Sequence, residues 1–142
     1  ADYASEKLWK PLGATHPAKW HTDGFMGTEM AFCCFNSNTR DFARFGQMML
    51  QQGNYSGQQI LDSSFVNLAT KPFAVPHYGH SFWIYDKLGT HIYAQNGLLG
   101  QYIIVIPERD LVIVRLGHHP GKKVGVFNQV FVDIVTEVLK QF

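Results

Sequence analysis

A covalent hydrolase needs a nucleophile with a base beside it, and none of the usual local patterns of such a pair occurs in this chain. No Ser is followed by Lys three positions later, no Gly-x-Ser-x-Gly turn is present, and no Gly-x-x-x-x-Gly-Lys loop exists. Ser56 and Ser81 remain open as triad members, because triad partners are set by the fold and not by spacing.

Metal or thiol chemistry is not expected either. Cys33 and Cys34 are adjacent, and a bridge between neighbours needs a strained ring, so we expect two free thiols buried as small hydrophobes. The seven His show no His-Glu-x-x-His spacing, and His118 and His119 are expected to lie in a loop before Pro120. We therefore expect no metal site and no cofactor.

Composition narrows the classes of function. The 142 residues are 46% hydrophobic, enough for one packed core. A formal charge of +1 offers little attraction to nucleic acid or anionic lipid. No apolar run approaches the roughly 20 residues that span a bilayer, and Ala1–Lys7 does not resemble a signal peptide. Neither a nucleic-acid partner nor a membrane-spanning segment is expected, and the compartment stays open.

The N-terminal half is predicted to be helices joined by loops. Helical spacing predicts a first helix over Tyr3–Trp9 with Asp2 as its N-cap, followed by an ordered loop over 14–38. A second helix is predicted from an N-cap at Thr39 to a left-handed C-cap at Gly53. A short third helix is predicted over Ser63–Ala69, capped by Asp62. In the second helix Phe42, Phe45, Gly46 and Met49 form one face.

The C-terminal half is predicted to be an antiparallel meander followed by a helix. Strand-like runs lie at Tyr78–Tyr85, His91–Gln95, Gln101–Ile106 and Leu111–Leu116. The charged segment Pro107–Asp110 suits a hairpin between the last two strands. Apolar residues from Phe127 to Leu139 recur at helical spacing. Both last strands are apolar on both faces, so each face of the sheet needs cover.

The order of these elements resembles the C-terminal section of class C β-lactamases and their relatives, which include D-Ala-D-Ala carboxypeptidases, esterases and aminohexanoate-oligomer hydrolases. The resemblance rests on Tyr78-Gly79-x-x-x-Trp83, a strand ending in Gly97, Gly100-Gln101-Tyr102, Pro107-Glu108 and the terminal helix. Upstream, Trp9–Gly13 is similar to the family's Pro-Leu-Gly turn, and Asn38–Gly46 to its Thr-x-Arg-Asp-Leu-Ala-Arg-Phe helix.

The resemblance implies an α+β fold: a small antiparallel sheet with a long C-terminal helix packed on it, completing a larger α/β sandwich. Residues 1–142 would be one C-terminal portion of a larger domain, with a helical and loop segment over 1–77 and strands with the terminal helix over 78–142. Family members are often periplasmic or secreted proteins of bacteria.

The resemblance also implies a site. In the family, a Ser-x-x-Lys helix, a Tyr-x-Asn loop and a Lys-Thr-Gly strand build the active site. Only the third has a counterpart here, Gln95-Asn96-Gly97. The family geometry makes the backbone amide of Leu98, next to Gly97, one of two oxyanion-hole donors. Without the resemblance, the preferred interpretation is that Gly97 only relieves crowding where a strand ends and a turn begins.

Substrate preference follows from the departures from the family pattern. Gln95 replaces the Lys that helps to hold a substrate carboxylate, which argues against penicillin-like recognition. Gln95 and Asn96 can instead donate hydrogen bonds to an ester or amide oxygen. Trp20, in the loop after the Pro-Leu-Gly turn, is a further candidate for substrate contact. The alternative, at least as well supported, is a structural role in which Trp20 packs beneath a loop capped or braced by Asp23. Tyr3 is read as a packing residue and not as the family's catalytic Tyr.

The implied function is hydrolysis of a small ester, amide or peptide-like substrate through an acyl-serine intermediate, with Ser, Lys and Tyr supplied from outside this chain. The chain alone is expected to be inactive. The alternative is a non-catalytic relative or a stand-alone binding module on the same scaffold. As partners we expect the missing N-terminal part or a second copy, because residues among Ile103, Ile104, Val112 and Ile113 are expected to stay partly uncovered.

Overall fold

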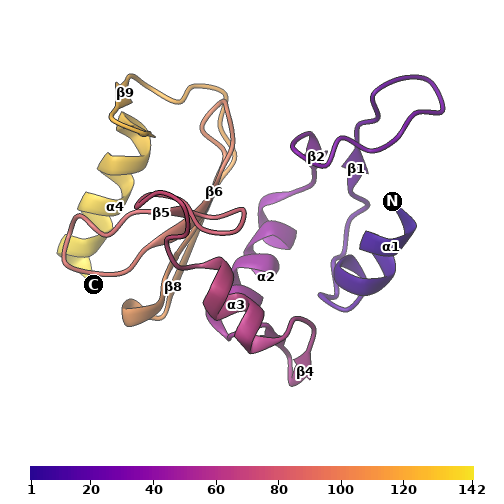
Figure 1. Ribbon diagram of the computed structural model, residues 1–142, viewed down its shortest axis with the longest axis horizontal. Coiled ribbons are helices and arrows are strands. Elements are labelled where there is room, and N and C mark those ends of the chain that lie inside the picture. The colour runs from indigo at the N-terminus through magenta and orange to yellow at the C-terminus, as the bar shows by residue number, and fades with distance from the viewer.

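A four-stranded antiparallel sheet with helices on both faces forms the centre of the molecule (Figure 1). The computed structural model describes all 142 residues. The sheet order is β5-β6-β7-β8, so each strand pairs with its neighbour in sequence. Its strands are β5 (Trp83–Ile84), β6 (Tyr93–Asn96), β7 (Tyr102–Ile106) and β8 (Leu111–Arg115). The predicted α+β fold with its C-terminal helix is confirmed.

Helices and three small hairpins surround this sheet. The helices are α1 (Asp2–Ala4), which continues into the π-helix η1 (Ser5–Trp9), then α2 (Thr39–Leu50), α3 (Ser63–Ala69), the 3-10 turn η2 (Pro107–Arg109) and α4 (Gln129–Gln141). The hairpins pair β1 (Lys19–Trp20) with β2 (Phe35–Asn36), β3 (Asn54–Tyr55) with β4 (Gln58–Gln59), and β9 (Lys123–Val124) with β10 (Phe127–Asn128). The division of the chain at residue 77 stays a prediction.

The two faces of the sheet belong to two separate cores. Alternate residues of a strand point to opposite faces. On one face Val105 packs with Met48 and Met49 of α2, and on the other Ile104 packs with Phe131 of α4. Figure 1 shows α2 and α4 on opposite sides of the sheet. The two-sided apolar pattern of β7 and β8 is thereby explained, since helices of this chain cover both faces.

Helix α2 lies close against the sheet at Gly46. A Cβ at this position would lie 2.5 Å from Cγ1 of Val112 and 3.0 Å from Cγ2 of Ile103. Ordinary side chains leave no room for such an approach, so glycine is required for the helix to rest on β7 and β8 at this distance.

Asp41 is the one fully buried charged residue of α2. Its carboxylate accepts hydrogen bonds from the backbone amides of Thr15 and His16, each at 3.1 Å, from the Asn38 side chain at 2.6 Å and from Arg44 at 2.6 Å. Burial alone would raise the pKa of Asp41, but these donors and the Arg44 charge hold that pKa below its usual range. The carboxylate therefore ties the segment after η1 to the start of α2.

Several predicted boundaries were wrong by a few residues. Asn38, not Thr39, caps α2: its side chain accepts from the Asp41 amide, and Thr39 is already helical. Asp2 lies inside α1 and provides no cap.

The bounds of two C-terminal elements also differ from the prediction. Of the predicted strand Tyr78–Tyr85 only Trp83–Ile84 is extended in the sheet, and Phe127 belongs to β10, before α4 begins. Gly53, with φ +86°, adopts the left-handed conformation expected of it.

The expectation of partly uncovered strand residues holds for Ile103, Val112 and Ile113 but is wrong for Ile104, which is fully buried beneath α4. Strand β8 has β7 on one side only and is an edge of the sheet. No helix in the structure has the length and apolar character that crossing a bilayer requires.

Candidate functional site

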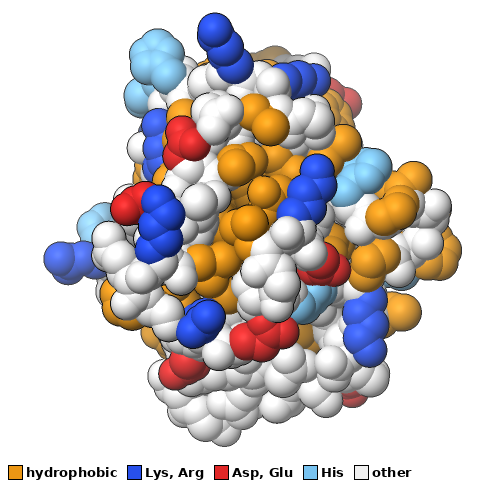
Figure 2. Space-filling model, turned by 90° about the vertical axis from the view of Figure 1, so that its left-hand side faces the viewer, with side chains coloured by type: hydrophobic (Ala, Val, Ile, Leu, Met, Phe, Trp, Pro, Cys, Tyr) orange, Lys and Arg blue, Asp and Glu red, His pale blue; other side chains and the backbone are white.

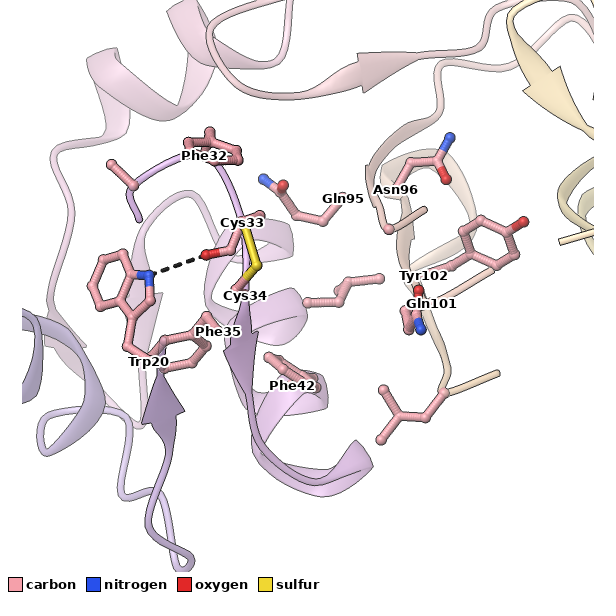
Figure 3. Close-up of a pocket in the computed structure, with 14 residues that line it drawn as sticks. Trp20, Phe32, Cys33, Cys34, Phe35, Phe42, Gln95, Asn96, Gln101 and Tyr102 are labelled. Carbon is pink, nitrogen blue, oxygen red and sulfur yellow. Dashed lines mark hydrogen bonds between the residues drawn. A yellow bond between two sulfur atoms is a disulfide. The ribbon is translucent and has the colours of Figure 1, made fainter. Parts of the chain in front are cut away.

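A pocket with a volume of about 280 Å³ lies between the β1–β2 hairpin and the β6–β7 turn (Figure 3). One wall comes from the N-terminal half and the other from the sheet. The lining residues are Trp20, Ala31, Phe32, Cys33, Cys34, Phe35, Phe42, Gln95, Asn96, Gly97, Gln101, Tyr102, Ile103 and Leu116. Four of the five predicted site residues, Trp20, Gln95, Asn96 and Gly97, thus meet around one pocket.

The polar edge of the pocket is built by the end of β6. Antiparallel pairing places Gln95 opposite Ile103 and Asn96 opposite Tyr102. One hydrogen of the Gln95 amide group is already used, because Nε2 donates to the carbonyl of Ser81 at 3.1 Å. This bond orients the side chain, whose second N–H and Oε1 remain for other partners. In Figure 3 the Gln95 amide points toward the Phe32 side of the pocket.

A tight turn follows this edge. The Gly100 amide donates to the Gly97 carbonyl at 3.1 Å, which closes a β-turn with Leu98 and Leu99 at its centre. The Gln101 side chain braces the turn: Oε1 accepts from the Leu99 amide at 3.0 Å, and Nε2 donates to the Gly117 carbonyl at 2.8 Å. The Leu98 amide has no acceptor within the chain. The turn thus carries an unused backbone donor directly after Gly97.

Gly97 itself has a structural reason to be glycine. A Cβ there would lie 2.7 Å from Oε1 and 3.0 Å from Cβ of Gln101. The interpretation that Gly97 relieves crowding is therefore supported by the geometry, and it does not conflict with a role beside an acyl group.

The prediction of free thiols was wrong, because Cys33 and Cys34 form a disulfide with each other that lines the pocket. The backbone accommodates the bridge at Cys34, whose φ of +73° is uncommon for a residue with a side chain. The Cys34 carbonyl accepts from the His21 amide at 3.1 Å and from the Asn36 side chain at 3.0 Å. The prediction considered the strain of a ring formed by two adjacent cysteines. It did not include the hydrogen bonds that hold the backbone at Cys34.

Trp20 has a structural role and also borders the pocket. Its Nε1 donates to the carbonyls of Met30 and Cys33, at 3.0 and 3.2 Å. Its ring meets the edge of Phe35 at a centroid distance of 5.4 Å, and Phe35 in turn contacts Trp9 at 5.0 Å. Asp23 braces the loop as expected, since its carboxylate accepts from the Thr28 amide at 2.9 Å.

Sequence reasoning missed the apolar wall formed by the Phe32–Phe35 segment and Phe42. Phe42 is predicted only on the core face of its helix, yet it also lines the pocket. The signal that was present is the run Phe32-Cys33-Cys34-Phe35, in which apolar residues crowd a loop. Tyr102 contributes to the lining, but Figure 3 shows its hydroxyl directed away from the pocket.

The two serines considered as possible nucleophiles are not part of a catalytic triad. Ser56 lies in the β3–β4 turn and Ser81 precedes β5, and neither hydroxyl is hydrogen-bonded to a His. No three His, Cys, Asp or Glu side chains cluster in a way that could hold a metal ion.

This chain is similar to a number of solved structures, including two candidate hydrolases. A candidate 6-aminohexanoate-dimer hydrolase from Bacillus anthracis matches 98% of the chain with a TM-score of 0.78 and 24% sequence identity, and a candidate β-lactamase from Bacteroides dorei matches 96% with a TM-score of 0.69 and 18% identity. The chain spans only 36% and 50% of their respective lengths. No family model and no curated protein matches the sequence. At these identities the likeness shows a shared fold, which is that of β-lactamase-like proteins.

Proposed function

We propose that this chain is the C-terminal portion of a β-lactamase-like serine hydrolase that cleaves an ester or amide through an acyl-serine intermediate. The observation that carries the proposal is the unused Leu98 amide beside the pocket edge of Gln95, Asn96 and Gly97. Leu98 does not line the pocket itself, but its amide follows directly after Gly97, which does, and a free backbone donor at such a place is a group that can stabilise a developing oxyanion. The fold shared with two candidate hydrolases supports the same reading.

In the proposed reaction a serine from a segment outside these 142 residues attacks the substrate carbonyl, and the carbonyl oxygen becomes an oxyanion. The Leu98 amide donates one hydrogen bond to it, and a second donor comes from the missing segment. Collapse of the intermediate breaks the C–O or C–N bond, and the alcohol or amine leaves with the proton that the serine hydroxyl gave to a base of that outside segment. Water then adds to the acyl-serine, which releases the acid and returns a proton to the serine. Gln95 and Asn96 orient the substrate through their amide groups, and Trp20 borders the space that the substrate fills.

The substrate class that fits this edge is a small ester or amide that is neutral near the scissile bond. None of the pocket-lining side chains is cationic, so no partner for a substrate carboxylate is present in this part of the site. One structural neighbour is described as acting on a 6-aminohexanoate dimer, which is an amide.

The missing N-terminal part is the partner that we propose for the free edge of the sheet. Strand β8 lacks a neighbour on one side, and this chain spans only 36% and 50% of the lengths of the two similar structures. Figure 2 shows a band of hydrophobic side chains on the α4 side, rimmed by charged residues. Half-buried residues of β8 and α4, such as Ile113, Ile134 and Leu139, lie on this side. A further strand on β8 would pair its open backbone groups.

One observation favours the alternative of a non-catalytic binding module. Gln95-Asn96-Gly97 retains only the glycine of the family's Lys-Thr-Gly strand, and no Ser-x-x-Lys occurs in the chain. A pocket without catalytic groups could still bind a small ligand.

Labelling of the full-length protein with a fluorophosphonate separates the two functions. A hydrolase is expected to acquire one phosphonate on a serine that lies outside these 142 residues and to hydrolyse nitrophenyl esters, while this chain alone acquires none. Absence of any adduct on the full-length protein supports the binding module. An adduct on Ser56 or Ser81 places the active site elsewhere and contradicts the proposal.

A further inference from the structure

The pocket carries more information than the reaction class alone. We infer that it is a subsite for an uncharged apolar group of the substrate, and that the Cys33–Cys34 disulfide forms the wall against which this group packs. The inference rests on the proposed function, because it assumes that the scissile ester or amide lies at the edge formed by Gln95, Asn96 and Leu98.

The chemistry of the lining excludes a charged occupant. Asp, Glu, Lys, Arg and His are absent from it, and its polar side chains, chiefly Gln95, Asn96 and Gln101, gather at the sheet side. A charged group placed there would lose water without gaining an opposite charge. The remaining surface, from Phe32 and the disulfide to Phe42 and Ile103, is apolar. A substrate that uses both regions has a polar carbonyl at one end and an apolar body at the other.

The volume sets the size of that body. A cavity of about 150 Å³ lined by apolar side chains is enough for a benzene molecule. The pocket of about 280 Å³ therefore accepts an aromatic ring or an alkyl chain. A methyl group, as in an acetyl ester, would leave most of this space without contact.

The disulfide is held in place from behind. The Cys33 amide donates to the Met30 carbonyl at 3.1 Å, and the Cys33 carbonyl accepts from the Trp20 indole. Figure 3 shows the two sulfur atoms between Phe32 and Phe35, facing the interior of the pocket. Sulfur is polarisable and packs well against rings and alkyl groups. The wall is thus preorganised, which lowers the entropy lost on binding.

Opening of the bridge should deform this wall. A dithiol reductant reduces the disulfide: the S–S bond breaks, Cys33 and Cys34 become thiols, and the reductant is oxidised to its own disulfide. Without the bridge, nothing covalent holds Cys34 at its positive φ, and the segment that carries Phe32 and Phe35 can relax. The affinity for the apolar group then falls, while a small polar ligand at Gln95 is affected less.

The test measures binding of three neutral amides to the full-length protein by calorimetry: acetamide, hexanamide and phenylacetamide. Hexanamide and phenylacetamide are expected to bind at least tenfold more tightly than acetamide. Joint replacement Cys33→Ser and Cys34→Ser, or reduction with dithiothreitol, is expected to remove most of that gain. Phe32→Ser should also reduce it, and because Phe32 is 87% exposed this variant has little effect on folding. Phe25→Ser, a fully exposed residue outside the pocket, serves as the matched control and keeps the gain.

Equal affinity for the three amides, or an undiminished gain in both the cysteine and the Phe32 variants, overturns the inference. Failure of the proposed function is a separate result. A protein that prefers hexanamide through this wall but is not labelled by a fluorophosphonate has the subsite without the hydrolase activity, whereas one that is labelled but shows no preference is a hydrolase whose apolar group binds elsewhere.

Discussion

The Asp41 carboxylate accepts a hydrogen bond from the Thr15 amide at 3.1 Å, and this contact joins two segments that are 26 residues apart. Thr15 stands near the start of the segment that carries Trp20, while Asp41 stands in the first turn of α2, which carries Phe42. A buried carboxylate outside the pocket therefore sets how the hairpin side of the pocket meets the helix side.

Replacement Asp41→Asn is expected to lower the free energy of unfolding by about 2–3 kcal/mol at neutral pH, because hydrogen bonds to a charged acceptor are lost while the shape is kept. The pKa of Asp41 is lowered in the folded protein, so its contribution is present above the ordinary Asp pKa of about 3.9 and is lost as pH falls through the folded pKa. Denaturant unfolding of both proteins between pH 7 and pH 3 should show their difference shrinking toward the acid end. A difference that is constant with pH contradicts the assignment.

The oxyanion role of Leu98 can be isolated by a change that leaves the turn intact. Leu98 occupies the second position of the Gly97–Gly100 turn, where proline is favoured. Leu98→Pro removes the amide N–H, together with the leucine side chain, and is expected to lower kcat of the full-length enzyme by about 100- to 1000-fold, with a small effect on Tm. Leu98→Ala retains the amide and should keep kcat. Equal kcat in the two variants would remove Leu98 from the site.

Substitution of Leu98 is a sharper test than substitution of Gly97. A Cβ at position 97 would clash with the Gln101 side chain, which accepts a hydrogen bond from the Leu99 amide, so a loss of activity could come from displacement of the turn.

A cation at position 95 tests whether Gln95 replaces the family's Lys. Gln95→Lys in the full-length enzyme is expected to raise kcat/KM for carboxylate-bearing substrates about tenfold, the effect of one charge-assisted hydrogen bond. Gln95→Met has similar length without the charge and should give no increase. The measurement compares matched substrates with and without a carboxylate, and an identical response of both kinds to the new Lys speaks against the assignment.

Strand β8 makes the isolated chain prone to association. We expect sedimentation velocity to show concentration-dependent dimers and a hydrophobic dye to bind, because an open edge and half-buried side chains such as Ile113 remain available. Val114→Lys places a charge on the edge strand and should reduce dimer formation while the melt stays cooperative. A monomer without dye binding at high concentration indicates that the chain is a self-sufficient domain.

Regular elements were predictable where one face of a helix or strand is buried in a core. The apolar spacing of α4 follows from the one face that packs on the sheet, and the continuous apolar runs of β7 and β8 follow from the two faces of the sheet, each covered by a core. Exact helix starts were less predictable, because Asn38 and Thr39 are adjacent and both are good capping residues. Local spacing alone does not choose between them.

The site was predictable only in its sheet half. Gln95, Asn96 and Gly97 are consecutive, so a resemblance located them together, whereas the opposite wall is assembled by contacts between distant segments. Trp20 meets Phe35 across a hairpin whose two strands are far apart in sequence, and Phe42 arrives from a helix. The disulfide was missed because a general rule about ring strain was applied without knowledge of the hydrogen bonds around Cys34.

Gly46 has a consequence for specificity although it does not line the pocket. Residues four apart share one face of a helix, so Phe42 and Gly46 point toward the same side of the sheet. Glycine at position 46 lets α2 lie close against Val112 and Ile103, and the spacing of helix and sheet fixed there also fixes the spacing between Phe42 and Ile103, which both line the pocket. The bulk of residue 46 therefore acts as a spacer: a larger residue there would lift Phe42 and deepen the pocket, and would change which chain lengths fit without touching any residue that meets the ligand.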